Sequence, residues 1–457
     1  MPSTPALRVA IVGAGPAGIY AADILSKSAD VSIDLFERLP APYGLVRYGV
    51  APDHPRIKGI ILALYKVLQR GDIRLLGNVD YGTDITMADL REHYDAVIFA
   101  TGAIRDADLN IPGVDLPGSY GAADFVSWYD GHPDVPRTWP LEAEKVAVIG
   151  NGNVALDVAR VLSKHVDDLR STEIPANVED GLSANPVTDV HIFGRRGPAQ
   201  VKFSPLELRE LGQVPGVDVI VYDEDFEFDE GSEEALESSN QTRQVVKTLT
   251  DWTLRSPAGH PRRVHLHFLH SPVEIVGNGK VERLRTERTE LTGDGSVRST
   301  GRFEEFDVQA VYRAVGYFGS PLPDVPFDAV SGVIPNTGGR VLGDDGQPLA
   351  RTYATGWIKR GPVGLIGSTK SDAAETIRNL LEEFEGGERP APNRENDAIL
   401  QKLQDRGVSF TTWHGWELLD TYERQLGEAA GRERIKVVPR EEMTRISLSD
   451  AAVEVGY

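Results

Sequence analysis

Short apolar runs alternate with amphipathic stretches through the first hundred residues of the chain. Residues 9–12 are uniformly apolar, and residues 31–36 alternate with the period of a strand before ending at Glu37. Residues 57–69 have the spacing of a helix, and residues 94–100, which are apolar apart from Asp95, predict a buried strand. This alternation predicts a doubly wound α/β domain, in which helices cover both faces of a mainly parallel sheet.

The same pattern begins again in the middle of the chain. Residues 146–149 and 190–193 are predicted strands, and the polar stretch 167–187 between them is predicted to be a loop longer than the usual crossover. Residues 264–315 are rich in strand-forming patterns. A second α/β domain, with additional strands, is therefore predicted.

The last third of the chain returns to the first pattern. Residues 353–384 predict a strand, a Gly-rich turn and a helix, followed by a linker over residues 386–395 that is rich in Pro, Gly and charge. The tail beyond it has a helical pattern and contains Trp413 and Trp416. This layout predicts one α/β domain inserted into another, with the last third completing the first.

Two glycine-rich turns carry the most specific chemistry. They are Gly13-Ala14-Gly15-Pro16-Ala17-Gly18 and Gly150-Asn151-Gly152-Asn153-Val154-Ala155. Each follows an apolar run and opens a helical pattern, which is the setting of a dinucleotide fingerprint. The first glycine permits the tight turn, the second lets a pyrophosphate approach the backbone, and the third position allows close packing of helix on strand. Two purely structural turns are the alternative.

The end of the second strand in each domain distinguishes the two coenzymes. Glu37 lies 19 residues after Gly18, where a carboxylate accepts hydrogen bonds from ribose hydroxyls and suits FAD or NAD. The matching strand of the second domain runs into Gly194-Arg195-Arg196-Gly197, with no acid. Two guanidinium groups favour the 2′-phosphate of NADP. FAD beside NADPH would form a hydride relay, because a flavin accepts two electrons together and releases them singly.

Composition excludes several other classes of protein. The formal charge is 48 − 69 = −21, which disfavours a nucleic-acid surface. The chain has no cysteine, so redox-active disulfides, thiolate nucleophiles and Cys-bound iron–sulfur clusters are excluded. No His-Glu-x-x-His or similar spacing occurs, and no metal site is predicted. The acidic stretch 223–237 is expected to be a solvated, mobile insertion.

The hydropathy of the chain and its first residues indicate where in the cell the protein is expected. The longest apolar stretch is too short for a membrane span. The first predicted strand begins too early to leave room for a signal peptide. A soluble, cytoplasmic protein without membrane insertion is therefore expected.

Several longer segments are more discriminating than the glycine turns. They are Pro42-Tyr43-Gly44-Leu45-Val46-Arg47, Val50-Ala51-Pro52-Asp53-His54-Pro55, residues 150–160, Gly194-Arg195-Arg196-Gly197, Leu206-Glu207-Leu208-Arg209-Glu210-Leu211 and Gly356-Trp357-Ile358-Lys359-Arg360-Gly361-Pro362. Over nearly the whole chain these segments resemble the adrenodoxin-reductase-type ferredoxin–NADP⁺ reductases, most closely the bacterial flavoprotein members. The resemblance implies an NADP domain over residues 108–323, inserted into an FAD domain formed by residues 1–107 and 324–457.

The resemblance also implies individual coenzyme contacts. Besides Gly13, Gly15 and Gly18 of the first turn, the implied FAD contacts are Ala17, Glu37, Leu45, Val79, Trp357, Gly364, Leu365 and Ile366. The implied NADP contacts are Asn151, Gly152, Asn153, Val154, Arg195, Arg196, Glu207 and Gly364. One departure is visible, because some relatives carry an NADP-contacting Arg near Ala107, whereas here the nearest Arg is Arg105. That contact is therefore in doubt.

Two further features concern the chemistry at the flavin. The resemblance places His54 near the flavin, hydrogen-bonded to the acid that matches Glu210, as an electrostatic or proton-positioning pair. Ser371-Asp372 predicts the N-cap and first turn of a helix whose N-terminus is directed at the flavin N1/O2 edge. The alternative to a role at the flavin is a structural one: His54 could be an ordinary lone histidine, and Trp357 an aromatic residue of the core.

The function implied by the resemblance is that of a monomeric ferredoxin–NADP⁺ reductase. It would pass hydride from NADPH to FAD and then single electrons to a ferredoxin, a small acidic iron–sulfur protein that supplies an acceptor such as a cytochrome P450. Basic residues proposed for docking are Arg209, Arg243, Lys247, Lys359, Arg360 and Arg378. A flavin-dependent monooxygenase and a non-catalytic NADPH- or FAD-binding sensor subunit are the alternatives.

Overall fold

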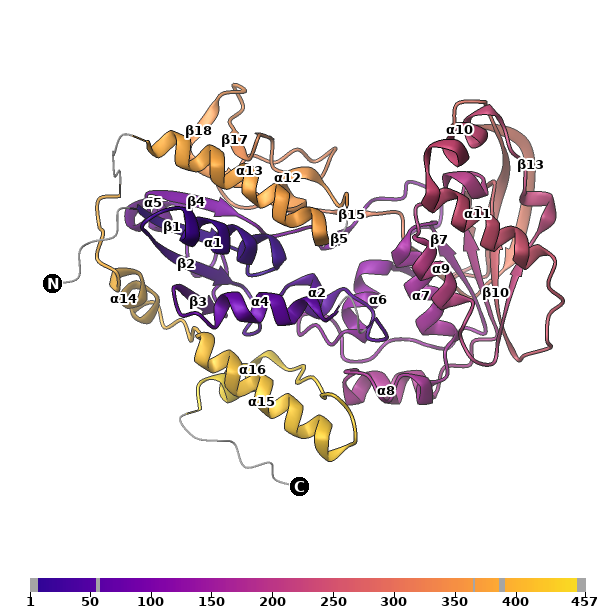
Figure 1. Cartoon of the computed structure of the whole chain (residues 1–457). Helices are drawn as coiled ribbons and strands as arrows, with labels where there is room; N and C mark the ends of the chain where they lie inside the picture. Colours follow the sequence, from indigo (N-terminus) through magenta and orange to yellow (C-terminus); the bar gives the residue numbers. More distant parts are fainter. Residues whose placement is uncertain (1–6, 55–57, 365, 386–390, 450–457) are drawn as a thin grey trace. The chain divides into compact units, whose positions relative to one another are not determined.

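The chain forms two compact units, which are described separately (Figure 1). The computed structural model describes residues 7–54, 58–364, 366–385 and 391–449. Unit 1 comprises Met1–Arg105, Asp130–Asp134 and Tyr317–Tyr457, and unit 2 comprises Asp106–Tyr129 and Val135–Gly316. The chain passes from unit 1 to unit 2 after residue 105 and returns after residue 316; these two points are called the main crossings. Both precede the implied domain boundaries, which follow residues 107 and 323.

Unit 1 is built on a seven-stranded sheet in the order β16-β17-β18-β4-β1-β2-β3. Strands β18, β4, β1, β2 and β3 are parallel, whereas β16 and β17 are antiparallel additions at one edge. The bounds are β1 (Leu7–Val12), β2 (Val31–Glu37), β3 (Ile73–Gly77), β4 (Ala96–Phe99), β16 (Asn336–Thr337), β17 (Arg340–Leu342) and β18 (Pro348–Ala354). Short strands β5 (Arg105–Asp106) and β15 (Tyr317–Phe318) lie at the two main crossings.

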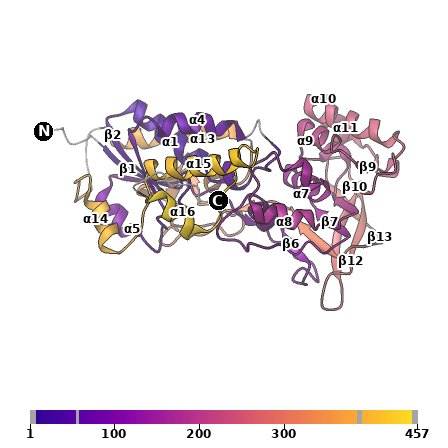
Figure 2. The same ribbon diagram turned by 90° about the horizontal axis from the view of Figure 1, so that it is seen from below.

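Helices cover both faces of this sheet. Alternate residues of β1 enter separate cores: Val9 and Ile11 pack with α1, α4, α13, α15 and α16, whereas Ala10 and Val12 pack with α5 and α14. The bounds are α1 (Pro16–Ser28), α2 (Leu45–Tyr48), α4 (Ile60–Leu68), α5 (Met87–His93), α12 (Trp357–Arg360), α13 (Ile366–Phe384), α14 (Ala398–Asp405), α15 (Trp413–Ala429) and α16 (Arg440–Ser447). Figure 2 shows α15 beside α4, where the rings of Trp413 and Tyr65 lie 5.0 Å apart.

The short segment Asp130–Asp134 belongs to unit 1 although its neighbours in sequence belong to unit 2. Arg440 donates to Asp134 at 2.7 Å, and Arg38 forms an ion pair with the same carboxylate. The ring of His132 packs edge-on against Tyr48, and its Nδ1 accepts a hydrogen bond from the backbone N–H of Asp134 at 3.1 Å. This geometry requires a neutral imidazole, and burial lowers the pKa of His132 to about 4.

We expect His132 to make the stability of unit 1 sensitive to acid. The unfolded chain binds a proton at the ordinary histidine pKa, about 6.5, whereas the folded state resists it until about pH 4. The free energy of unfolding should therefore fall by about 2–3 kcal/mol as the pH decreases through this window. His132→Asn, which keeps an acceptor but does not titrate, should remove that part of the slope in urea unfolding at several pH values. The exposed His414→Asn is the matched control, and parallel slopes for wild type and His132→Asn would contradict the prediction.

Unit 2 contains a six-stranded parallel sheet in the order β6-β14-β7-β8-β10-β9. The bounds are β6 (Ser119–Gly121), β7 (Lys145–Ile149), β8 (Asp189–Phe193), β9 (Val217–Val221), β10 (Arg262–His267) and β14 (Ala310–Arg313). A separate antiparallel sheet consists of β11 (His270–Val276), β12 (Arg283–Leu291) and β13 (Val297–Asp307). The two sheets share a core in which Ile149 and Phe193 meet Ile275 and Leu284.

The helices of unit 2 correct two sequence predictions. Their bounds are α6 (Ala122–Tyr129), α7 (Asn153–Ser163), α8 (Ala176–Ser183), α9 (Pro205–Leu211), α10 (Glu230–Ser238) and α11 (Asn240–Thr253). The stretch 167–187, predicted as a loop, contains α8, which follows Pro175 and buries Val178 and Leu182 four residues apart. The acidic stretch 223–237, predicted as a solvated, mobile insertion, is largely exposed but contains the helix α10. It is attached through the buried Asp225, which pairs with Arg288, and through Asp229, which caps α10.

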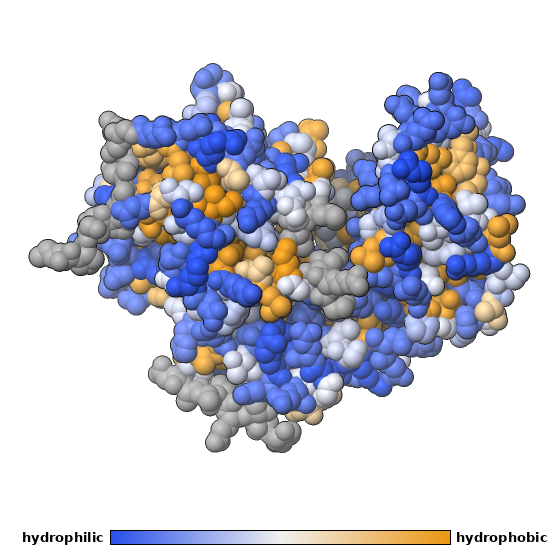
Figure 3. Space-filling view, viewed as in Figure 1, coloured by the Kyte–Doolittle hydropathy of each residue, from blue (hydrophilic) through white to orange (hydrophobic). Residues whose placement is uncertain are grey.

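The surface is consistent with the high content of charged residues. Hydrophilic residues predominate over α10 and α15 on the face shown in Figure 3. Among the described residues, no helix combines the length and the apolarity that crossing a membrane requires. The doubly wound α/β fold and the insertion of one such domain into another are confirmed.

Candidate dinucleotide-binding sites

The two glycine turns occupy equivalent positions in the two parallel sheets. Each follows the central strand, β1 or β7, at the point where strand order reverses, which is where doubly wound sheets bind nucleotides. Gly13 and Gly150 have φ angles of 110° and 138°. A Cβ at Gly13 would overlap the carbonyl oxygen of Ala100, just after β4, and a Cβ at Gly150 would overlap that of Ala314, just after β14. Both first glycines are therefore required by the close approach of the neighbouring strand end.

The helices that follow these turns begin without side-chain caps among the described residues. Gly15 precedes α1 and Gly152 precedes α7, and neither can cap a backbone N–H. Among the other helices, α5, α9, α10, α11 and α15 have such caps, whereas α2, α4, α8, α12, α14 and α16 lack them too. What sets α1 and α7 apart is that each follows a glycine turn at the end of a central strand. The first N–H groups of α1 and α7 are thus available to a ligand, and the helix dipole favours an anionic one. This arrangement fits a pyrophosphate in each unit.

The middle glycine of the second turn provides a test that separates binding from folding. Nothing lies within 4 Å of a Cβ built at Gly152, so the fold accommodates alanine there. The methyl group would occupy the side from which a pyrophosphate approaches the backbone. We expect Gly152→Ala to weaken NADPH binding by about tenfold or more, with an unchanged unfolding temperature.

Isothermal titration calorimetry would measure the NADPH affinity of Gly152→Ala, and differential scanning calorimetry would measure its unfolding temperature. Gly150→Ala is the contrasting variant, since it should lower the unfolding temperature through its collision with Ala314. Full NADPH affinity in Gly152→Ala would contradict the assignment.

Glu37 ends β2 beside the first turn. Its Oε2 accepts the backbone N–H of Ala14 at 2.9 Å and its Oε1 accepts that of Leu39 at 3.1 Å. Burial raises the pKa of Glu37 above its ordinary value. The two backbone hydrogen bonds act in the opposite direction, because they favour the ionised form, but they do not cancel the effect of burial. Each carboxylate oxygen retains acceptor capacity for a ribose hydroxyl.

The other FAD candidates lie around the first turn or after β18. Ala17 is on α1, and a Cβ at Gly356 would overlap its methyl group, so the segment before Trp357 passes close to α1. Leu45 and Trp357 are half-buried first residues of α2 and α12. The side chain of Val79 lies in the core, while its backbone N–H donates to the carbonyl oxygen of Glu37 at 2.9 Å.

The segment before α13 corrects one prediction. Helix α13 begins at Ile366, five residues before the predicted N-cap Ser371, so Ser371 and Asp372 lie inside the helix. Gly364 is exposed with a φ of 82°, and Leu365 lies outside the described residues. Asp372 instead accepts the Gly356 backbone N–H at 2.6 Å and the Thr355 hydroxyl at 3.0 Å. Sequence spacing gave no signal for this role, because the two segments meet only in the folded chain.

The arginine pair follows β8 on a well-anchored loop. The carbonyl of Arg195 accepts the Thr289 hydroxyl at 2.7 Å, and that of Arg196 accepts the Leu269 N–H at 3.2 Å. Arg195 is exposed and Arg196 is half-buried. Within the described part of the chain neither guanidinium has an ion-pair partner, so both remain available to an anion.

The remaining NADP candidates join the second turn to α9. Asn153 Oδ1 accepts the backbone N–H of Ser204, which caps α9. Glu207, in the first turn of α9, is buried with its Oε2 3.7 Å from the guanidinium of Arg160. Asn151 and Val154 are half-buried at the turn itself. Asn153 and Glu207 therefore have structural contacts in addition to any coenzyme contact.

The candidate pair His54 and Glu210 is divided between the units. His54 is buried in unit 1, and Glu210 is on α9 in unit 2. Their pairing stays a prediction.

The position where some relatives carry an NADP-contacting Arg lies at the first crossing. Ala107 is half-buried there, and Arg105, the nearest Arg, is exposed.

The proposed docking residues are also distributed over both units. Lys359 is unsuited to docking because it is buried and pairs with Asp372 at 3.0 Å and Glu375 at 2.7 Å. Lys247 pairs with Asp251, whereas Arg209 and Arg378 are exposed. Arg243 donates to the carbonyls of residues 236 and 237 at the end of α10, and Arg360 donates to that of Val363.

Known proteins match the chain over almost its full length. NADPH-ferredoxin reductase FprA of Mycobacterium leprae is 44% identical over 452 residues, covering 96% of this chain and 98% of that protein. The mitochondrial NADPH:adrenodoxin oxidoreductase of Homo sapiens is 37% identical over 460 residues, covering 96% and 91%. This chain belongs to the family of NADPH-ferredoxin and NADPH:adrenodoxin reductases.

A solved structure of this family agrees with the fold. FprA of Mycobacterium tuberculosis in complex with NADPH gives a TM-score of 0.89 at 41% identity, covering 97% of this chain and all of that chain. Residues 7–193 also match the pyridine nucleotide-disulphide oxidoreductase family model. Because this chain has no cysteine, the disulphide chemistry in that family description does not extend to it.

Proposed function

We propose that this chain is an NADPH-dependent FAD flavoprotein that passes electrons from NADPH to a ferredoxin. The observation that carries the proposal is the pair of uncapped helix N-termini after glycine turns, one beside a carboxylate and the other beside two unpaired arginines. The sequence identity to NADPH-ferredoxin reductases over nearly the whole chain supports it. FAD, when bound, accepts an electron pair from a nicotinamide and releases electrons one at a time.

The chain's own residues supply binding and orientation. In unit 1 we assign the FAD pyrophosphate to the N-terminus of α1 and the ribose hydroxyls to Glu37. In unit 2 we assign the NADPH pyrophosphate to the N-terminus of α7 and the 2′-phosphate to Arg195 and Arg196. Each assignment matches anionic groups to free N–H donors or guanidinium groups, and hydroxyl donors to a carboxylate.

An anaerobic titration with NADPH tests the proposal. The purified protein should be yellow, lose its flavin absorbance on adding NADPH, and regain it on adding an oxidised ferredoxin. A flavin that NADPH does not bleach would support a non-catalytic sensor instead. Substrate-dependent, coupled oxygen consumption would support a monooxygenase.

The role proposed for His54 gives a separate kinetic prediction. Hydride transfer between two coenzymes needs no side-chain acid, so an electrostatic or positioning residue modulates the rate without being essential. We expect His54→Ala to slow flavin reduction by NADPH without abolishing it, as measured by stopped-flow absorbance. Loss of all reduction with FAD still bound would contradict this role. The exposed His414→Ala is the matched control.

We further propose that the partner is an iron–sulfur ferredoxin and that the chain acts as a monomer. The support is the partner type in the relatives' names and the exposed cations Arg209 and Arg378. Association through such charges should weaken as salt is added.

A further inference from the structure

The loop of residues 194–204, which carries the arginine pair, folds back onto the second glycine turn. The backbone N–H of Lys202 donates to the carbonyl oxygen of Asn151 at 3.0 Å. Two residues later, the backbone N–H of Ser204 donates to Oδ1 of Asn153 at 2.8 Å. Lys202 therefore lies beside the turn that we assign to the NADPH pyrophosphate, and these two hydrogen bonds fix its backbone there.

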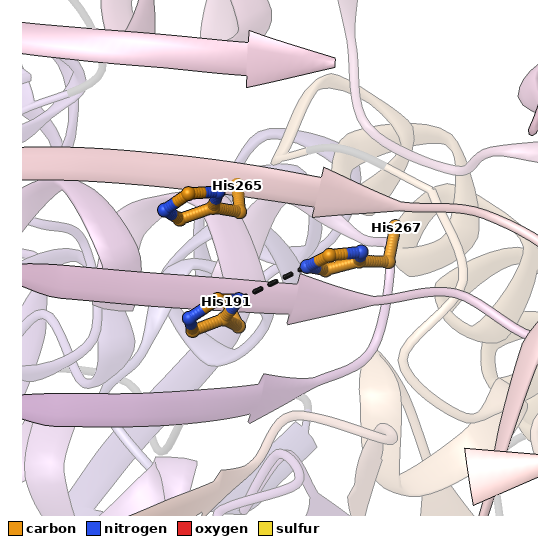
Figure 4. Close-up of side chains that lie close together, drawn as sticks. All are labelled: His191, His265 and His267. Atoms are coloured by element: carbon orange, nitrogen blue, oxygen red, sulfur yellow. Dashed lines mark hydrogen bonds between the residues drawn. The ribbon is translucent and has the colours of Figure 1, made fainter. Parts of the chain in front are cut away.

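The start of the same loop is fixed at the end of β8 (Figure 4). The rings of His191 on β8 and His267 on β10 lie nearly parallel, with centroids 5.3 Å apart, and a hydrogen bond of 3.0 Å joins Nδ1 of the first to Nε2 of the second. The carbonyl oxygen of His267 accepts the backbone N–H of Gly194 at 2.9 Å. A Cβ at Gly194 would lie 2.9 Å from Nδ2 of Asn151, so the loop leaves the strand in contact with the glycine turn. Both ends of the loop are thus held against the turn.

The side chain of Lys202 is exposed, whereas that of the next residue, Phe203, is buried. Within the described part of the chain, no carboxylate forms an ion pair with the Lys202 ammonium group. The four-carbon stem of lysine carries this charge to a ligand as a compact, mobile point charge. In a chain with a formal charge of −21, an unpaired cation at this position attracts an anion locally against the unfavourable mean charge.

We propose that Lys202 binds the pyrophosphate of NADPH, as a third cation in addition to Arg195 and Arg196. The inference rests on the proposed placement of NADPH at this turn. The two arginines are assigned to the 2′-phosphate, which leaves only the uncharged N–H donors of α7 for the two negative charges of the pyrophosphate. A charge-assisted hydrogen bond from an ammonium group complements those donors, and lysine is a common phosphate ligand of this kind.

The two ends of the loop correspond to different parts of a dinucleotide. Arg195 and Arg196 directly follow the second strand of the unit, where this fold binds the adenosine ribose and its 2′-phosphate. Lys202 is instead bonded to Asn151, next to Gly152, whose open side is where this fold binds the pyrophosphate. The position of Lys202 therefore favours the pyrophosphate over the 2′-phosphate.

Two fragments of the coenzyme separate the roles of the three cations. ADP-ribose has the pyrophosphate without the 2′-phosphate, and adenosine 2′-phosphate has the reverse. Isothermal titration calorimetry of the full FAD-loaded protein, directly or in competition with NADP⁺, would measure both affinities. Lys202→Met should weaken binding of ADP-ribose and NADP⁺ by about tenfold, the lower end for a hydrogen bond to a charged group, and leave that of adenosine 2′-phosphate unchanged. The double variant Arg195→Ala/Arg196→Ala should weaken adenosine 2′-phosphate and spare ADP-ribose.

Three further variants complete the test. Lys202→Arg keeps the charge and should retain most of the affinity for ADP-ribose, whereas Lys280→Met, at an exposed lysine between β11 and β12, is the matched control and should bind as wild type does. Unchanged affinity for ADP-ribose in Lys202→Met, or a loss confined to adenosine 2′-phosphate, would overturn the proposal. If Gly152→Ala weakens ADP-ribose but Lys202→Met does not, this inference alone fails. If neither variant weakens it, the placement of NADPH at this turn fails as well.

Discussion

Replacing both Arg195 and Arg196 by alanine should cost about 3–5 kcal/mol of the preference for NADPH over NADH, taking about 1.5–3 kcal/mol for each hydrogen bond to a charged group. This corresponds to a factor of about 150 to 5,000 in the ratio of kcat/KM for the two coenzymes. The backbone of the loop is anchored through Thr289 and Leu269, so removal of the two side chains should leave the loop in place. The effect should therefore be confined to the 2′-phosphate.

Steady-state kinetics with both coenzymes would measure this ratio. NADH, which lacks the 2′-phosphate, should be used about as well by the double variant as by wild type, so the change appears as lost NADPH activity. Arg298→Ala, on the exposed β13 of the same unit, is the matched control and should not change the ratio. A ratio that stays constant in the double variant would show that the 2′-phosphate binds elsewhere.

Strand-and-turn features of both domains could be predicted from the sequence because they are local. The apolar runs at 9–12 and 146–149 and the strand predicted over 190–193 each lie within an observed strand, and Glu37 is the last residue of β2 as predicted. A parallel strand is buried on both faces, so a few consecutive apolar residues identify it. The glycine turns could be predicted because their Gly-rich pattern directly follows an apolar run in the sequence. The contacts that require Gly13 and Gly150, with Ala100 and Ala314, are seen only in the folded chain.

Helix boundaries were harder to predict where apolar residues are sparse. Helix α8 was missed because only Val178 and Leu182 in its eight residues are buried. The start of α13 was placed at Ser371 on the strength of a capping pattern, whereas the helix already begins at Ile366. A serine followed by acids resembles a cap, but inside a helix the same serine hydroxyl donates back to a carbonyl, here that of Ser368.

Long-range polar contacts could not be predicted at all. Arg47 and Glu423 form a buried ion pair although they are 376 residues apart in sequence, so no local spacing reveals it. Lys359 was proposed for docking as one of several basic residues, yet the folded chain buries it between Asp372 and Glu375. In each case the deciding partner is supplied by the tertiary fold.

A buried ion pair links helix α15, in the tail of the chain, to the candidate FAD segment of unit 1. Glu423 on α15 is fully buried and accepts hydrogen bonds from Arg47 at 3.0 Å, Arg434 at 3.2 Å and the Val437 backbone at 3.0 Å. The Arg47 guanidinium also makes a cation–π contact with Trp416, which lies about two helical turns before Glu423 on α15. Because Arg47 is in α2, which begins at Leu45, this pair fixes the position of a proposed FAD contact.

Removing the negative charge of Glu423 should therefore have a large effect on both stability and cofactor retention. Glu423→Gln leaves the guanidinium group of Arg47 buried without a counter-charge, whereas Arg434 keeps Asp420 at 2.7 Å. Losing one partner of such a buried pair costs about 3–5 kcal/mol. We expect the free energy of unfolding in urea to fall by that amount and FAD to be released more readily on dilution. Glu428→Gln, at an exposed position of the same helix, should change neither quantity.

The double variant Arg47→Met/Glu423→Leu distinguishes a lost charge pair from lost packing. Apolar residues of similar volume avoid the desolvation of two charges, so part of the lost stability should return, although Arg434 then pairs with Asp420 alone. If Glu423→Gln were as stable as wild type, the network would be solvated in the folded chain and could not position α2. If the double variant were far less stable than Glu423→Gln, the shape of these side chains rather than their charge would join α15 to the FAD segment.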